Sequence, residues 1–229
     1  MTVARITKES AAEKQAVSQE ELAAINGYTM RELGAEEVFT FRLAACDNQI
    51  DRDNEKFSDA ALEGLAALYP GKPVLLDHTW SAETQCARVY GAAVENDPAR
   101  AGVRRLMLRC FVPRLDSTKA HIEAIETGLK RECSVGCAVK RRLCGLCGKD
   151  YWTECLHIKG QEYDGQMCYV VLDGAADAYE VSFVAVPAQR EAGVVKSGET
   201  ENADEKWKVV ARAELAMEGI RYGAGAPLK

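Results

Sequence analysis

The sequence predicts an α+β protein whose core is about seven strands with two helices beside them. Three observations support this fold class. Runs rich in β-branched and aromatic residues recur between positions 38 and 186, turn-forming residues separate them, and only two stretches among them have a helical apolar period. The 229 residues, 47% hydrophobic and 28% charged, suffice for one large domain or two small ones. This composition is typical of globular proteins rather than disordered or fibrous ones.

In the first half of the chain, residues 9–33 are Ala-rich with apolar residues at loosely helical spacing, which predicts a helix. Residues 38–46 are rich in β-formers and predict a strand, and a polar connection follows. Ser58 or the aspartate after it is expected to cap a helix that the Pro-Gly pair at 70–71 ends. The apolar run within 73–78 predicts a short buried strand.

In the second half, residues 88–95 and 105–112 predict two strands joined through a turn-like segment. Ser117 is expected to cap a helix that continues to Glu126, and Gly128 is its expected stop. Three further strands are predicted at residues 133–143, 168–172 and 179–186.

The chain is expected to divide into three parts. Residues 1–37 form a helical N-terminal extension, residues 38–196 the main domain, and residues 197–229 a linker followed by a helix and a tail. The linker, residues 197–206, is acidic and polar, and the helix is predicted from about 205 to 218. This helix has one apolar face and is predicted to be a docking element for a partner or a second copy, dispensable for chemistry.

Charge and hydropathy exclude several functional classes. The net charge of −6 disfavours a general nucleic-acid-binding role, because such proteins usually carry a surplus of Lys and Arg. No apolar run approaches the ~18 residues that a membrane span needs, and no signal-peptide core follows Met1. We therefore expect a protein without membrane association that stays in the compartment where it is made.

A cluster of cysteines and one histidine predicts a metal site. The sequence contains nine cysteines, an odd number, and no export signal accompanies them, so metal ligation is favoured over disulfides. Cys144 and Cys147 have the spacing and flanking glycine of a metal-binding knuckle, and Cys155 and His157 follow eight residues later. These four residues would form a closed, structural Zn²⁺ site, with Cys168 as the alternate ligand.

Two other interpretations of these cysteines remain open. They could be buried or free thiols, as is favoured for Cys46, Cys86, Cys110, Cys133 and Cys137 in their apolar stretches. Alternatively, the first pair could be a thioredoxin-like redox motif, but no βαβ pattern surrounds it.

Taken on their own, few residues indicate a nucleophile and a base. His157 belongs to the metal hypothesis, and His121 is expected to face solvent in the middle of a helix. His78 ends an apolar run and begins a loop, where either a structural or a functional histidine fits. Ser134 lies at the start of a strand, two residues before Gly136, and glycine lets a substrate carbonyl come close.

A carboxylate could orient a histidine, and two acidic residues precede or begin the last predicted strand. Asp177 and Glu180 could each take that role, or be solvated charges.

Four stretches together resemble the prohead (capsid maturation) serine proteases of tailed phages and prophages. They are Asp51–Phe57, Tyr69–His78, Glu132–Gly136 and Tyr179–Ala188, and their order and separation also fit that family. The resemblance covers residues 38–196, and a cysteine-rich insert at about 140–170 is similar to a feature of one subgroup. Residues 1–37 and 197–229 lie outside it.

The resemblance implies a serine endopeptidase of the herpesvirus-assemblin type, with a mostly antiparallel β-barrel core, surrounding helices and the small zinc-knuckle insert. Ser134 would be the nucleophile and His78 the general base, with Glu180 as the third member. The implied substrates are phage scaffold and major capsid protein, with self-cleavage and contacts to portal or a second copy as further expectations. The implied location is the bacterial host cytoplasm, inside assembling proheads.

Two alternatives remain open at this stage. One is a catalytically silent, zinc-stabilised assembly module that docks to scaffold or capsid protein. The other is a metal-dependent hydrolase with its metal at Asp77 and His78. A catalytic metal normally has three protein ligands, and the sequence shows no evident third ligand for this site.

Overall fold

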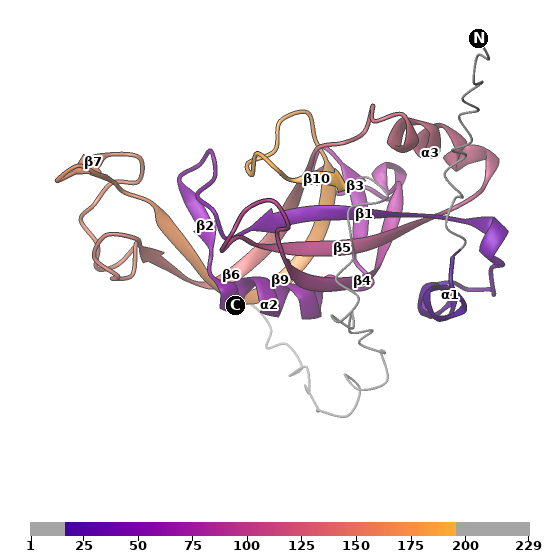
Figure 1. Ribbon diagram of the computed structural model, residues 1–229, viewed down its shortest axis with the longest axis horizontal. Coiled ribbons are helices and arrows are strands. Elements are labelled where there is room, and N and C mark those ends of the chain that lie inside the picture. The colour runs from indigo at the N-terminus through magenta and orange to yellow at the C-terminus, as the bar shows by residue number, and fades with distance from the viewer. Residues whose placement is uncertain (1–16, 196–229) are drawn as a thin grey trace, which may run out of the picture.

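The computed structural model describes residues 17–195, which form an α+β structure around one eight-stranded sheet (Figure 1). The helices are α1 (Gln19–Asn26), α2 (Asp59–Leu68) and α3 (Lys119–Glu126), with short 3₁₀ helices at Ala35–Glu37, Ala82–Thr84 and Asp116–Thr118. The strands of the large sheet are β1 (Val38–Asp47), β2 (Glu55–Phe57), β3 (Pro73–Leu76), β4 (Ala87–Asn96), β5 (Arg104–Pro113), β6 (Cys133–Cys144), β9 (Val170–Phe183) and β10 (Gly193–Val195). A separate hairpin contains β7 (Glu162–Tyr163) and β8 (Gln166–Met167).

The sheet has the order β10-β1-β5-β4-β3-β9-β2, and β6 pairs with the opposite edge of β9. The 14-residue strand β9 therefore organises this end of the sheet. Its β6 edge is paired along most of its length, whereas its other edge is shared by β2 near one end and β3 near the other. Helix α2, which connects β2 to β3, packs across β9, β4 and β5.

The α+β class is confirmed, but the predicted antiparallel barrel is wrong. Strands β2 and β3 run parallel to β9, so the sheet is mixed. The sheet also does not close into a barrel: β10 has three residues, and within residues 17–195 it adds to its ladder with β1 only one isolated bridge, from Gly193 to Glu132. A three-residue strand is too short to carry full ladders on both edges.

The strands predicted at 168–172 and 179–186 are a single strand, β9. Residues 173–178 have low intrinsic strand preference, but β6 pairs with them across two register irregularities, and this tertiary pairing overrides the local preference. Strands β2, β7, β8 and β10 were not predicted, because two or three residues are too few to show a period.

The helix boundaries are confirmed in part. Ser58 is the N-cap of α2, and its Oγ accepts a hydrogen bond from Ala61 N at 3.0 Å. The cap predicted at Ser117 is wrong: that residue lies inside a 3₁₀ turn, and α3 begins at Lys119. The helix predicted over 9–33 is described only from 17 onward, where α1 is shorter and is capped by Ser18. The C-terminal helix lies outside the described residues.

The core lies between α2 and the sheet. Leu62 and Leu65 of α2 are fully buried against it. A Cβ on Gly64 would lie 2.8 Å from Ala175 Cβ, so this glycine lets α2 approach β9 closely. Within residues 17–195, no helix is both long and apolar enough to span a membrane.

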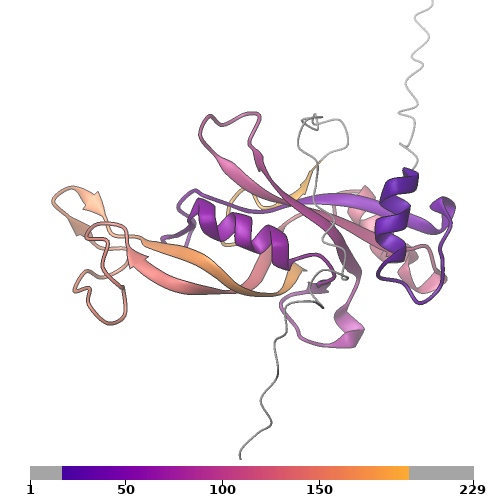
Figure 2. The same cartoon turned by 90° about the horizontal axis from the view of Figure 1, so that it is seen from below.

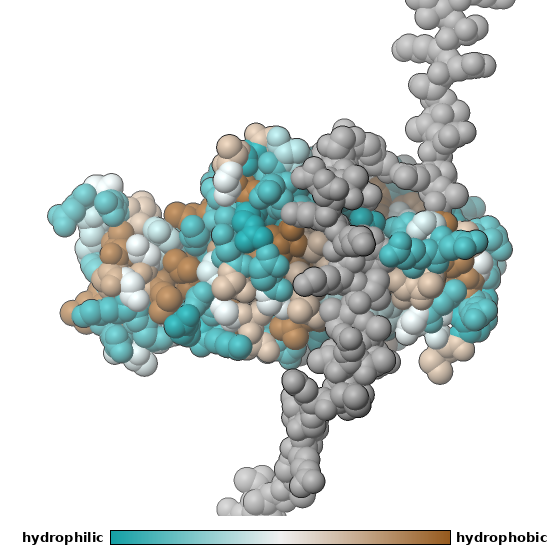
Figure 3. Space-filling view, turned by 60° about the horizontal axis from the view of Figure 1, so that its bottom comes forward, coloured by the Kyte–Doolittle hydropathy of each residue, from teal (hydrophilic) through white to brown (hydrophobic). Residues whose placement is uncertain are grey.

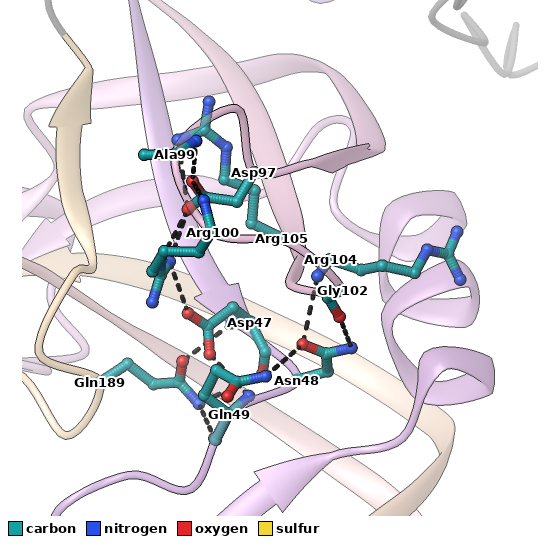
Figure 4. Close-up of polar contacts among 10 residues, drawn as sticks. All are labelled: Asp47, Asn48, Gln49, Asp97, Ala99, Arg100, Gly102, Arg104, Arg105 and Gln189. Carbon is teal, nitrogen blue, oxygen red and sulfur yellow. Dashed lines mark hydrogen bonds and ion pairs between the residues drawn. The ribbon is translucent and has the colours of Figure 1, made fainter.

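A polar network fastens the loop after β9 to the end of β1 (Figure 4). The amide of Gln189 accepts from Asp47 N at 2.9 Å and donates to Asp47 O at 3.3 Å. Arg100, from the β4–β5 turn, donates to Asp47 Oδ2 at 3.0 Å and to Asp97 Oδ2 at 2.6 Å. Because these groups are mostly buried and paired, the loop is held in place beside β6.

The insert between β6 and β9 projects from the sheet as an arm, at the left of Figure 1 and again in Figure 2. Figure 3 shows hydrophobic residues among hydrophilic ones on its surface. Large apolar side chains exposed on this arm are Trp152, Leu156, Ile158 and Met167.

Candidate active site and metal centre

His78 lies on a tight turn at the end of β3. Asp77 and His78 both have positive φ angles, 51° and 52°, which turn the chain out of the strand. Two backbone hydrogen bonds hold the turn: Asp77 N donates to Phe183 O at 2.9 Å and Thr79 N to Leu76 O at 3.0 Å. Non-glycine residues seldom adopt such angles, and their clustering is characteristic of functional sites.

Glu180 orients the His78 ring. His78 Nδ1 lies 2.7 Å from Glu180 Oε1, and the Glu180 side chain is only 2% exposed, whereas that of His78 is 40% exposed. A carboxylate only accepts hydrogen bonds, so Nδ1 is the donor in this contact. The other ring nitrogen, Nε2, is therefore the one left to accept a proton.

Two further side chains, which sequence reasoning missed, fix this pair. Ser182 Oγ accepts from His78 N at 3.1 Å and donates to Glu180 Oε2 at 2.5 Å. Tyr69 OH donates to Glu180 O at 3.2 Å, and burial raises the pKa of Tyr69 well above its usual value, so it remains a donor. The signal for Ser182 was its place two residues after Glu180, which puts both side chains on one face of β9.

Ser134 lies on the strand next to Glu180, on the same face of the sheet. It is directly opposite Ser182 in the β6–β9 ladder, and Gly136 is opposite Glu180. Opposed residues of antiparallel strands project from the same face. The partly buried Ser134 also lines a cavity of about 250 Å³ with Asp51 and Gln189. Its hydroxyl makes no hydrogen bond with any residue from 17 to 195. The structure therefore pairs His78 with Glu180 and leaves Ser134 Oγ unbonded on the adjoining strand, and neither His78 nor Glu180 lines the cavity that Ser134 lines.

Glycine at position 136 is needed because the Glu180 carboxylate crosses β6 there. A Cβ on Gly136 would clash with Glu180 Oε1. The sequence singled out this glycine only as an opening beside Ser134, whereas the structure gives it a second role in seating the carboxylate.

Replacing Gly136 by Ala is therefore expected to displace Glu180 from His78. We expect the free energy of unfolding to fall by about 1–3 kcal/mol, as for other overpacked sites. The imidazole ¹⁵N shifts of His78 should also change from a single Nδ1-protonated tautomer to a mixture. Gly27→Ala, at the end of α1 and away from Glu180, is the matched control. An unchanged His78 tautomer in Gly136→Ala would contradict this role.

The metal-site prediction is supported by the positions of its four residues. The ligand atoms of Cys144, Cys147, Cys155 and His157 all lie within 4.8 Å of one another. Cys147 Sγ is 3.7 Å from Cys155 Sγ, and His157 Nδ1 is 3.6 Å from the Sγ atoms of both Cys144 and Cys155. A tetrahedral ion with metal–sulfur bonds of about 2.3 Å has edges of about 3.7 Å, so the cluster could hold a metal ion.

These separations are also much longer than the ~2.05 Å of a disulfide bond, so the cysteines are free thiols.

Backbone N–H groups favour the ionised form of one of these cysteines. Although burial opposes ionisation, hydrogen bonds from the amides of Cys147 and Leu146 lower the pKa of Cys144 to about 6. A thiolate, the form that ligates metals, is thereby favoured at neutral pH.

Cys168 lies beside this cluster but outside the four-residue group. It is fully buried, and its Sγ is 3.9 Å from Cys144 Sγ. We expect Cys168→Ser to retain metal in the described arrangement, measured as metal per chain by elemental analysis. Loss of metal in this variant, with Cys147→Ser retaining it, would mean that Cys168 replaces one of the four.

The other candidates from the sequence take part in neither the His78–Glu180 pair nor the metal cluster, or form no metal-ligand group within the described residues where one was considered. The Asp177 side chain is half-exposed, and its Oδ1 lies 3.6 Å from Lys72 Nζ. Asp177 therefore pairs with Lys72, and the partner of His78 is Glu180. His121 is partly buried rather than solvent-facing, because Lys130 packs against it with Nζ 2.5 Å from Nδ1. Asp77 and His78 belong to no group of three potential metal ligands in the part of the chain that is described. The scattered cysteines Cys46, Cys86, Cys110 and Cys133 are buried and Cys137 is partly buried, as predicted.

The chain matches no protein-family model, no curated protein and no solved structure.

Proposed function

We propose that this protein is a serine endopeptidase in which Ser134 is the nucleophile, His78 the general base and Glu180 the residue that orients His78. The observation that carries the proposal is the buried Glu180 carboxylate, 2.7 Å from Nδ1 of a half-exposed histidine, with Ser134 on the adjoining strand and the same face. A buried acid, an oriented imidazole and an unbonded hydroxyl are the three components that acyl transfer needs.

In the proposed reaction, Ser134 Oγ attacks the carbonyl carbon of a peptide bond while His78 Nε2 takes the hydroxyl proton. The same nitrogen then gives that proton to the leaving amine, and water hydrolyses the acyl-enzyme by the reverse sequence of proton transfers. Glu180 keeps the ring in the required tautomer and stabilises the imidazolium as it forms. Backbone N–H groups beside Ser134 would hold the oxyanion.

The cysteine-rich arm is proposed to hold a structural Zn²⁺. Three thiolates and one imidazole suit zinc, and four protein ligands leave no position for a reactive water. Its role would be to shape an arm that has few buried apolar side chains of its own.

The proposed substrates are phage scaffold and major capsid protein, cleaved inside assembling proheads in the host cytoplasm, with the chain itself as a further substrate. This assignment depends on the family resemblance of residues 38–196. Portal protein and a second copy of the chain are proposed as contacts rather than substrates.

A second function, a catalytically silent assembly module, is favoured by two observations. Ser134 and His78 share no hydrogen bond among the described residues. The arm also exposes two large apolar side chains, Trp152 at 70% and Leu156 at 95%, which would suit docking.

Incubating the full chain with its co-encoded scaffold and capsid proteins separates the two functions. Wild type and the control Ser117→Ala, altered in a distant 3₁₀ turn, should produce cleaved bands on a gel, whereas Ser134→Ala should not. A folded wild-type chain that binds these proteins without cleaving either would establish the module and overturn the protease.

A further inference from the structure

A larger cavity, of about 450 Å³, lies on a different part of the surface. Its walls come from the connection between α1 and β1, the end of β5, and the segment 82–88 that connects β3 to β4. Leu33 and Phe111 give it a buried apolar floor, and Met30 and Leu115 are exposed apolar side chains at its rim. An open apolar cavity with an exposed apolar rim is typical of a binding surface.

The cavity also carries positive charge. Of its three arginines, Arg31 is neutralised by Glu37, whose Oε1 lies 2.6 Å from Arg31 Nη2. Arg88 instead donates to Gly71 O at 2.7 Å, and Arg114 donates to Val38 O at 3.1 Å. Neither of these two makes an ion pair with a carboxylate between residues 17 and 195, so about two positive charges are left for an occupant.

The chain itself is directed toward this cavity where its described part ends. In the antiparallel β10–β1 ladder, Gly193 pairs with Ala44 and Val195 with Arg42, so the chain runs toward Val38. Val38 is the ladder partner of Pro113, which lines the cavity. Val38 is four residue steps along β1 from Arg42, a span of about 13 Å. The 34 residues from 196 to 229 are more than sufficient to reach it.

The composition of that segment is complementary to the cavity. Its first part, residues 197–206, contains four acidic residues, Glu199, Glu201, Asp204 and Glu205, and one basic residue, Lys206. Residues 207–229 add two acidic and four basic residues, so the acidic surplus is confined to the first part. Apolar residues follow in the next part of the segment: Val209, Val210, Leu215 and Ile220. Acidic residues would meet the two arginines that lack a carboxylate partner among the described residues, and apolar residues would cover the exposed rim.

We infer that residues 197–229 of the same chain dock in this cavity. The acidic stretch pairs with Arg88 and Arg114, and the apolar stretch covers Met30 and Leu115 at the rim. Since residues 82–87 of the cavity wall follow the His78 turn in the chain, the docked segment also braces the connection that begins at His78. The inference does not depend on the chain being a protease.

Photo-crosslinking in the full chain tests this. p-Benzoylphenylalanine is placed at Met30 or at Leu115, with Leu156 on the arm, which is also exposed, as the control site. From the two rim sites we expect crosslinks to peptides of 197–229, in a band of monomer size. The control site should give none. Reversing the four acidic residues to Lys should lower the yield several-fold, because like charges would then face the arginines.

Two results would overturn the inference. A crosslinked band of dimer size would show that a second copy fills the cavity, and rim-site yields no higher than that of Leu156 would show that the segment does not dock there. A yield unchanged by the charge reversal would refute the pairing with Arg88 and Arg114.

Discussion

Ser134→Ala and His78→Ala are each expected to lower kcat/KM for peptide cleavage by about 10⁴-fold or more, while the chain stays folded. The loss should be large because the hydroxyl opposite Ser134 in the β6–β9 ladder, Ser182 Oγ, already donates to Glu180 and so cannot replace Ser134 Oγ. The fold should persist because Ser134 is partly buried and makes no hydrogen bond within residues 17–195, so little stabilisation is lost. Rates on a peptide substrate and unfolding midpoints measure the two effects.

The double variant Ser134→Ala/His78→Ala should be no slower than either single one, since the two groups act as a unit. Glu180→Gln should lose less activity than Ser134→Ala, because the ring is disoriented rather than removed. Near-wild-type cleavage by either single alanine variant, with contaminating protease excluded, would contradict the assignment.

Removing the metal is expected to unfold the arm while leaving the sheet intact. We expect one zinc per chain, lost on chelation and in Cys147→Ser, because this exposed thiol supplies one corner of the proposed tetrahedron. Zinc binding in small metal-folded units is worth about 10–16 kcal/mol, so an arm with this little core should lose its order without the ion. Hydrogen exchange should therefore accelerate first over residues 140–170.

Cys168→Ser is the matched control for this experiment, since it removes a neighbouring buried thiol that lies outside the four ligands. Protein that contains no zinc and whose nine thiols all titrate freely would contradict the metal site.

Much of the fold was predictable where the signal is local. The sequence narrowed the N-cap of α2 to Ser58 or Asp59, because capping depends on the residues directly after the cap, and the structure shows Ser58. The parallel pairing of β3 with β9 was not predictable, because it joins Val74 to Val181 and no local period records such a partner. The continuity of β9 through 173–178 was missed for the same reason.

The two candidate sites also differ in whether their residues lie close together in the sequence. The metal cluster was predictable from spacing, because Cys144 and His157 are 13 residues apart in one insert. The pairing of His78 with Glu180 spans 102 residues. The sequence offered Asp177 and Glu180 as alternative partners for a histidine, and the family resemblance favoured Glu180. Ser182 and Tyr69 were missed because their roles are contacts across the fold, and the need for glycine at 136 appears only once the Glu180 carboxylate is placed.

Labelling with a fluorophosphonate, which reacts with activated serine hydroxyls, tests the central claim most directly. After digestion and mass spectrometry, the account predicts a phosphonylated Ser134 in wild type, reduced to background in His78→Ala, with Ser182 unmodified. A folded wild-type chain that remains unlabelled, or that carries the label on a different serine, would contradict it.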